Sequence, residues 1–154
     1  MQDFVHLHVH TQYSLLDGQA SVARLVDKAM QNGMKGIAVT DHGNMFGIKE
    51  FTNYVNKKNS GPKGEIKDLK KRLVGIEAGS IECEDKEAEV AACKAKIVEA
   101  ENKLFKPIIG CEMYVARRTM DLKEGKQDQS GYHLIVLAKN EKGYHNLIKL
   151  VSHA

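Results

Sequence analysis

Short apolar runs alternate with amphipathic helical segments along most of this chain, and that alternation limits its fold to a few architectures. Four runs predict strands, at residues 4–10, 36–40, 107–115 and 132–138. Helices are expected between them, the first after Ser21, whose side chain can cap it, and the last over residues 144–151. About four strand–helix units in this order predict an α/β fold built on a parallel sheet or barrel.

Residues 57–105 interrupt this rhythm. A helix that includes Phe46 and Val55 is expected to end at the polar run 59–62. Beyond that run, apolar residues recur every three or four positions in two stripes: Ile66, Leu69, Leu73 and Ile76, then Val90, Cys93, Ile97, Ala100 and Leu104. We expect a helical hairpin inserted within the domain. The alternative is a charged, partly disordered loop, because ordering so polar a stretch buries little apolar surface.

Composition excludes several classes of protein. The 154 residues are 42% hydrophobic and 28% charged, which is typical of a globular domain. No run approaches the roughly 18 apolar residues of a membrane span, and the N-terminus lacks the pattern of a signal peptide, so we expect a cytoplasmic protein with no membrane partner. The net charge of +3 neither requires nor excludes a nucleic-acid partner. The three cysteines form no CxxC pair, so neither a zinc ribbon nor a disulfide framework is expected.

Histidines and carboxylates gather at the ends of the predicted strands. Alternation over residues 4–10 places His8 and His10 on one face of a strand, from which both imidazoles can reach one ion. Asp17 follows in the next loop, beside Gly18. The later strands contribute His42, Glu112 and His133. Because such positions converge on one mouth of a parallel barrel, these six residues are the candidate metal ligands.

The chemistry of this set indicates which ions it suits. Imidazole together with carboxylate favours zinc, manganese or iron over calcium. Glu112 could bridge two ions, and Glu112, His8 and His10 are the candidate catalytic residues. Clustered metals would lower the pKa of a bound water and clamp both oxygens of a phosphoester displacement.

Other residues near these positions have simpler interpretations. Asp41 alternates away from His42 and is expected to cap a helix or to support the ligands. Arg117 and Arg118 could meet a phosphate, but a solvated basic pair is preferred. Cys111 is expected to be buried and inert. Three further histidines are read as structural or partly exposed: His6, His145 and His153.

Several strings in the chain resemble one family. They are residues 4–11 (FVHLHVHT), 13–18 (YSLLDG), 38–47 (AVTDHGNMFG), 106–112 (KPIIGCE), 132–140 (YHLIVLAKN) and 143–150 (GYHNLIKL). Together and in this order they are similar to the opening of the PHP (polymerase and histidinol phosphatase) domain of bacterial DNA polymerase III alpha subunits. The resemblance implies a seven-stranded βα barrel with up to three metals. By motif position its ligands are His8, His10, Asp17, His42, Glu112 and His133.

The same resemblance implies a role within a larger protein. Residues 1–154 would be the N-terminal part of a PHP domain in a DNA-directed DNA polymerase, whose partners are DNA, the rest of the polymerase chain and other replication subunits. In this family an intact metal site is associated with phosphoesterase or 3′–5′ proofreading activity. The alternatives are a catalytically silent structural module of the polymerase and a free-standing small-molecule phosphatase. Further family ligands would lie beyond Ala154, and half a barrel is expected to self-associate through its exposed sheet edge.

Overall fold

The structure, a computed structural model, describes residues 4–154 and divides the chain into two units. Unit 1 contains the residues up to Tyr54 together with Lys106–Ala154. Unit 2 is Val55–Phe105. None of the helices in the described part of the chain is long and apolar enough to cross a membrane.

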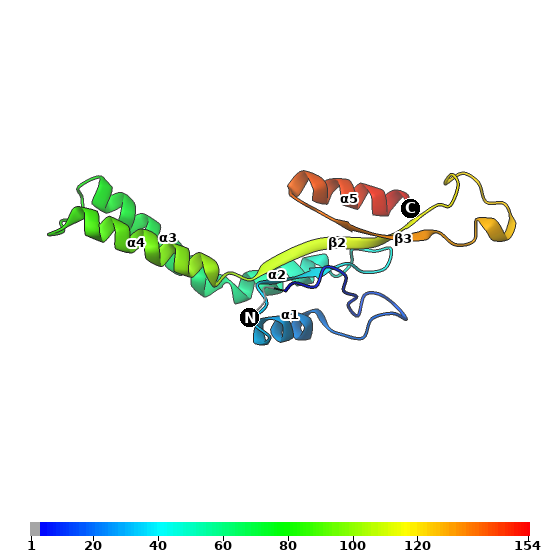
Figure 1. The fold of residues 1–154 in the computed structure, drawn as a ribbon, viewed down its shortest axis with the longest axis horizontal. Coiled ribbons are helices and arrows are strands. Elements are labelled where there is room, and N and C mark those ends of the chain that lie inside the picture. Colours follow the sequence, from blue (N-terminus) through cyan, green and yellow to red (C-terminus); the bar gives the residue numbers. More distant parts are fainter. Residues whose placement is uncertain (1–3) are drawn as a thin grey trace. The chain divides into compact units, whose positions relative to one another are not determined.

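Unit 1 is built on three strands in the order β1 (Gly36–Val39), β2 (Lys106–Val115) and β3 (Tyr132–Leu137) (Figure 1). β1 and β2 are parallel, as predicted. β3 runs antiparallel to β2, so the prediction of an all-parallel sheet is wrong for this strand. The reason lies in the connection, residues 116–131. Among these residues the only helical segment is the short 3₁₀ turn η1 (Gly125–Gln127), whereas a parallel crossover needs a longer element, usually a helix.

The segment 4–10 lies beside β1 but does not form the predicted regular strand. The backbone amide of Ala38 donates to the carbonyl of His6, and the amide of Thr40 donates to the carbonyl of Val9, each at 2.9 Å. Between these two hydrogen bonds the segment 4–10 advances by three residues, while the backbone from Ala38 to Thr40 advances by two. The segment therefore contains one extra residue, as in a bulge. The bulge breaks the strict alternation expected for this segment, and Leu7 is about half exposed.

Three helices flank the strands of unit 1. α1 (Val22–Gln31) begins at Ser21, whose hydroxyl accepts a hydrogen bond from the amide of Arg24, as predicted. α2 (Ile48–Lys58) begins later than expected, so Phe46 precedes it. α5 (Glu141–His153) begins at Asn140, whose side-chain oxygen accepts from the amide of Gly143. Figure 1 shows α1 on one side of the strands and α5 on the other.

The core of unit 1 lies between these layers. α1 packs against β1, and α5 packs against β2. Buried side chains come from all four elements and from α2: Val22, Val26, Ala29, Ile37, Val39, Phe51, Cys111 and Leu147. Every residue of β1 is buried, which is typical of a strand that is covered on both faces. The strand that precedes His42 is therefore a rigid support.

Unit 2 contains two helices that pack along each other, α3 (Ser60–Glu77) and α4 (Lys86–Asn102). Their shared core contains six residues of the predicted apolar stripes: Ile66, Ile97 and Ala100, with Leu69, Leu73 and Leu104 against them. The polar break expected over residues 59–62 is wrong, because only Asn59 separates α2 from α3. Pro62 lies in the first turn of α3, where its missing amide hydrogen removes no helical hydrogen bond. That unit 2 is an insertion within the domain stays a prediction.

Asn59 joins the two ends of unit 2, and its replacement by alanine is expected to loosen the unit. Its side chain donates to the carbonyl of Phe105 at 2.8 Å and accepts from the amide of Phe105 at 2.9 Å. All of these groups are buried, so Asn59→Ala leaves two backbone groups unpaired at a cost of about 2–3 kcal/mol. Amide hydrogen exchange over residues 60–104 should accelerate by about 30-fold or more. Asn102→Ala, at an exposed position of α4, is the matched control and should leave exchange unchanged.

Candidate metal centre

The strand register brings three of the candidate ligands to one face of the sheet. The offset that pairs β1 with β2 continues beyond β1, so that His42 forms a bridge with Glu112. Across the antiparallel pair, Tyr114 faces His133. Glu112 and Tyr114 are two residues apart on β2 and share a face. His42, Glu112 and His133 therefore project from the same side at neighbouring positions.

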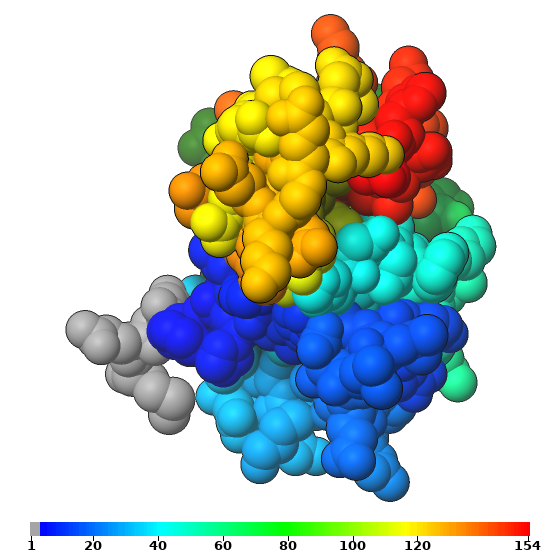
Figure 2. Space-filling model, turned by 90° about the vertical axis from the view of Figure 1, so that its right-hand side faces the viewer, coloured from blue at the N-terminus to red at the C-terminus, as the bar shows by residue number. Residues whose placement is uncertain are grey.

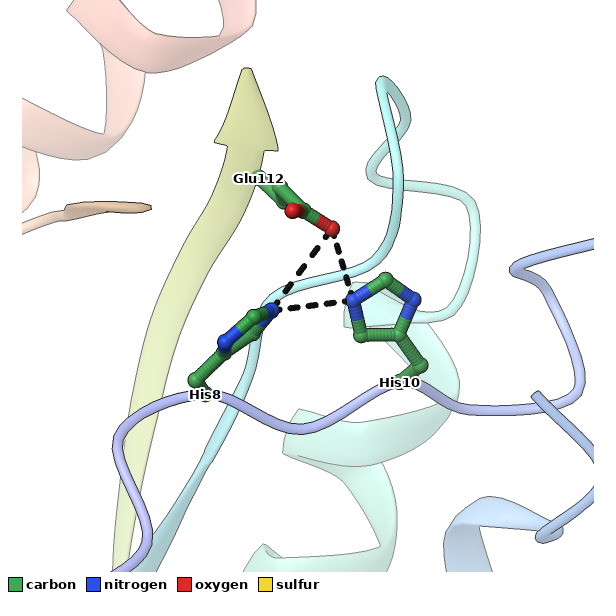
Figure 3. A group of neighbouring side chains, drawn as sticks. All are labelled: His8, His10 and Glu112. Atoms are coloured by element: carbon green, nitrogen blue, oxygen red, sulfur yellow. Dashed lines mark hydrogen bonds and ion pairs between the residues drawn. The ribbon is translucent and has the colours of Figure 1, made fainter. Parts of the chain in front are cut away.

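Glu112 is the centre of the cluster. Its carboxylate oxygen Oε2 lies 2.8 Å from Nε2 of His10 and 3.6 Å from Nε2 of His8, and the two histidine nitrogens are 3.1 Å apart (Figure 3). Its other oxygen, Oε1, lies 2.5 Å from Nδ1 of His133. The residue is 3% exposed. A buried carboxylate thus has histidines around both of its oxygens.

Asp17 and His42 complete the set on one side. Nδ1 of His42 lies 2.8 Å from Oδ2 of Asp17 and 3.8 Å from Oε2 of Glu112. The six side chains line a single open pocket of about 530 Å³: His8, His10, Asp17, His42, Glu112 and His133. The structure thus brings together all six of the residues that the sequence proposed. Their role as metal ligands stays a prediction.

The charge state of Glu112 reflects two opposing effects. Burial raises the pKa of its carboxyl group, while the neighbouring His10, His133, His8 and His42 lower it. The net pKa lies below the usual value for glutamate. Glu112 is therefore ionised at neutral pH, which is the form that a metal ligand requires.

Asp41 holds together the segments that carry the ligands. Its buried carboxylate accepts hydrogen bonds from the amide of Thr11 at 2.6 Å, from the Thr11 hydroxyl at 2.8 Å and from the Ser14 hydroxyl at 2.9 Å. The Ser14 oxygen in turn accepts from the amide of His42 at 2.9 Å. Of the two predicted roles, helix capping does not occur. Asp41 instead fixes the loop after His10 against the segment that contains His42.

Gly18 allows this loop to close. A Cβ atom at position 18 would lie 2.0 Å from the carbonyl oxygen of Thr11, which is far inside van der Waals contact. The amides of Asp17 and Gly18 both donate to the carbonyl of Ser14. Only glycine fits so close an approach. The tight turn leaves the Asp17 side chain about half exposed beside His42.

The spacing of the ligand atoms fits a divalent transition metal. When two donor atoms bind one zinc ion at about 2.0–2.1 Å and at a tetrahedral angle, the donor atoms lie about 3.3 Å apart. The three separations among His8, His10 and Glu112 are 3.1, 2.8 and 3.6 Å. A second group, His10, Asp17 and His42, also has its ligand atoms within 4.8 Å of one another. Both groups contain His10, so they form one connected set of donors rather than two separate sites.

One ring nitrogen of His10 is buried without a partner. Among the described residues, Nδ1 of His10 is the buried side-chain polar atom that has no hydrogen-bond partner. A buried donor or acceptor without a partner costs about 1–3 kcal/mol, so such atoms usually have a ligand or a water. The nitrogen that faces His8 and Glu112 is Nε2, so Nδ1 is not the ligand atom of this group, and it is the chemistry of the donor set that agrees with bound metal.

The remaining candidates do not line the pocket of the cluster. Cys111 is fully buried, as predicted, and burial raises the pKa of its thiol. Arg118 pairs with Asp128 and Glu124, and Arg117 donates to the carbonyl of Ser130. Neither arginine lines the six-residue pocket. The same holds for the three histidines outside the candidate set: His6, His145 and His153.

Two features of the site were missed by sequence reasoning. The ring of Tyr114 lies 4.9 Å from that of His42 and 4.6 Å from that of His133, centre to centre. Its position two residues after Glu112 on one strand was the available signal. The hydroxyls of Thr11 and Ser14 were also missed. No local pattern links them to Asp41, which lies about 30 positions further along the chain.

Comparison with known proteins gives a consistent result. The family described as "PHP domain" matches residues 6–154. DNA polymerase III subunit alpha of Borreliella burgdorferi is 39% identical over 152 residues, and that of Treponema pallidum is 40% identical over 152 residues. The subunit alpha of Aquifex aeolicus is 33% identical over 155 residues. These alignments cover 97–98% of this chain but only 9–10% of each relative, so the chain spans about a tenth of their length.

Proposed function

The chain belongs to the PHP domain family, and from this membership we propose that its six-residue cluster is a divalent metal site that hydrolyses phosphodiesters. The native ion is zinc, manganese or iron, and up to three ions bind in the complete domain. The whole protein is a DNA polymerase III alpha subunit in which this site removes nucleotides from a 3′ end. Its partners are DNA, the rest of the polymerase chain and other replication subunits.

The observation that carries the proposal is the buried carboxylate of Glu112 with histidines around both oxygens. His8 and His10 come from the N-terminal segment, and His133 comes from β3. Such residues are far apart in sequence, and burying a charged group is costly unless it is paired. A cluster of this kind at an open pocket is typical of a functional site rather than of a stabilising ion pair.

The two carboxylates of the cluster would have different roles. The carboxylate of Glu112 directs Oε2 toward His8 and His10 and Oε1 toward His133, which suits a bridging ligand. Asp17 is the more exposed carboxylate and lies beside His42, at the entrance from solvent. Bound ions would lower the pKa of a water and offset the charge that develops on the phosphodiester oxygens.

The finer features of the fold belong to the same proposal. The three strands and their helices are the N-terminal part of a seven-stranded βα barrel, and residues 57–105 are a helical insertion in it. The catalytic residues are Glu112, His8 and His10. Continuation of the polymerase chain would cover the exposed edge of β3, where Tyr132 and Leu134 are exposed. Residues 1–154 alone are expected to self-associate through this edge.

Metal dependence tests the proposal. The full-length protein, stripped with a chelator, should lose hydrolysis of a single-stranded 3′ end and recover it when zinc, manganese or iron is added. His8→Ala should lower the rate by about a hundredfold or more, because a lost ligand weakens metal binding. Elemental mass spectrometry should find fewer ions in this variant. Two results together would contradict the proposal: His8→Ala hydrolyses the substrate at the wild-type rate, and the wild-type protein binds no metal at this site.

Two other functions remain as candidates. A catalytically silent module would still stabilise the polymerase, and it predicts that Glu112→Ala lowers stability without affecting any hydrolysis. A free-standing small-molecule phosphatase would require a chain much shorter than the relatives. The first-named relatives are about ten times the length of the matched region, which favours the polymerase.

A further inference from the structure

A second pocket lies next to the six-residue cluster. It has a volume of about 460 Å³ and is formed by two loops, residues 13–17 and 42–46. It shares Asp17 and His42 with the pocket of the candidate metal centre. A ligand held at the metal centre therefore has direct access to this second space. In Figure 2 the blue atoms of the N-terminal part and the cyan atoms around residue 45 adjoin on the face that is shown.

The walls of this pocket carry large apolar side chains that nothing in the unit covers. Leu15 is 83% exposed, Leu16 is fully exposed and Phe46 is 78% exposed. We call these three residues the apolar subsite. Leu16 also has φ of 73°, a left-handed conformation that residues with a Cβ atom rarely adopt. Exposed apolar groups gathered at a pocket are typical of a binding surface.

The apolar subsite is held in place by hydrogen bonds between its two loops. The side-chain amide of Asn44 donates to the carbonyls of Tyr13 at 3.0 Å and His42 at 3.1 Å. Its oxygen accepts from the amide of Phe46 at 3.2 Å. The Ser14 hydroxyl accepts from the amide of His42. Both loops are thus tied to the segment that carries a candidate metal ligand, which gives the subsite a defined position relative to the reaction centre.

The composition of the two loops limits what they can bind. Neither loop contains lysine or arginine, so the subsite offers no cationic side chain to a second phosphate. Phe46 and the leucines instead offer flat and apolar surfaces. Nucleobases stack on such surfaces, and they do so whatever their sequence because every base has a π face. A base joined through its sugar to a phosphate at the metal centre is the occupant that matches both pockets.

We propose that the apolar subsite binds the base of the terminal nucleotide while its phosphodiester lies at the metal centre. This inference rests on the proposed function and adds the part of the substrate that is recognised, the base of the terminal nucleotide. A terminal base in a duplex is held by its pairing partner and by the neighbouring base, so an unpaired end is the better substrate. Phe46 is the residue that contributes most, since it supplies the aromatic face.

Two single-stranded oligonucleotides that differ only at the 3′ residue test the proposal on the full-length protein. One carries a normal base there, and the other carries an abasic sugar. The wild-type protein should hydrolyse the first with a kcat/KM about tenfold higher or more. Phe46→Ala should bring this ratio close to one. Phe4→Ala, which removes an exposed phenylalanine outside both pockets, should keep the wild-type ratio.

The same set of variants tests the base subsite and the phosphodiesterase separately. A wild-type ratio near one, or an unchanged ratio in Phe46→Ala, overturns the base subsite while leaving the phosphodiesterase intact. If neither oligonucleotide is hydrolysed, the proposed function is overturned. The base subsite is then tested by oligonucleotide binding alone. The measurement is the fluorescence of an oligonucleotide with 2-aminopurine at its 3′ end. Binding to the wild-type protein or to Phe4→Ala should quench this fluorescence, and binding to Phe46→Ala should quench it much less. Equal quenching by all three proteins overturns the base subsite.

Discussion

Glu112→Gln is expected to abolish the metal-dependent hydrolysis that we propose for the full-length protein, with a loss of about a thousandfold or more. Glutamine keeps the shape of the side chain but removes the negative charge that faces His8, His10 and His133. A neutral amide cannot bridge two cations as a carboxylate does. The electrostatic contribution of bound metal amounts to several kcal/mol, and each 1.4 kcal/mol is a factor of ten in rate.

The measurement is the rate of single-stranded 3′-end hydrolysis, together with the number of ions bound per chain. Glu141→Gln is the matched control, because Glu141 is an exposed glutamate at the start of α5, outside the six-residue pocket. It should leave both quantities unchanged. If Glu112→Gln lowers the thermal stability but leaves hydrolysis at the wild-type rate, the silent structural module replaces the phosphodiesterase as the function.

Asp41→Ala is expected to destabilise the 154-residue chain by about 3–4 kcal/mol. The carboxylate accepts three hydrogen bonds from Thr11 and Ser14, and it is almost completely buried. Hydrogen bonds to charged groups contribute about 1.5–3 kcal/mol each and are not additive. Removing the carboxylate also leaves the amide of Thr11 without a partner.

Urea unfolding, followed by circular dichroism, gives the free energy of unfolding for this comparison. Asp121→Ala removes an exposed aspartate from the loop between β2 and β3, and it should change that free energy by less than about 0.5 kcal/mol. Asp41→Ala should also weaken metal binding. The Ser14 hydroxyl accepts from the amide of His42, and without its hydrogen bond to Asp41 it holds His42 less firmly. An unchanged urea midpoint would show that Asp41 does not hold the loop.

Much of the local structure follows from the sequence because its causes are local. α1 begins at Ser21 and its stripe of Val22, Val26 and Ala29 is buried, as helical periodicity predicts. The apolar stripes of α3 and α4 meet in one core for the same reason. A helix needs only neighbours three and four residues away, so its pattern is visible in a single stretch of sequence. The start of α2 was misplaced because Phe46 fits the helical spacing but lies outside the helix, in the wall of a pocket.

The position of His133 shows what local patterns leave open. His133 lies near the beginning of its strand, and in a parallel sheet that end would be opposite to the one that carries Glu112. Because β3 is antiparallel, its beginning pairs with the end of β2, and His133 reaches Oε1 of Glu112. The sequence reasoning proposed the right neighbour with the wrong strand direction. Direction depends on the path of the connection, which no periodicity records.

The sequence by itself determined which residue types were available for chemistry and which segments would be helices, since both depend on neighbouring positions in the chain. Only the tertiary structure decided that β3 turns back, that Asp41 joins Thr11 and Ser14, and that two loops enclose an apolar pocket beside the cluster. Each of these pairs residues far apart in the chain. Their meeting depends on the packing of the whole unit, because no short-range preference brings them together.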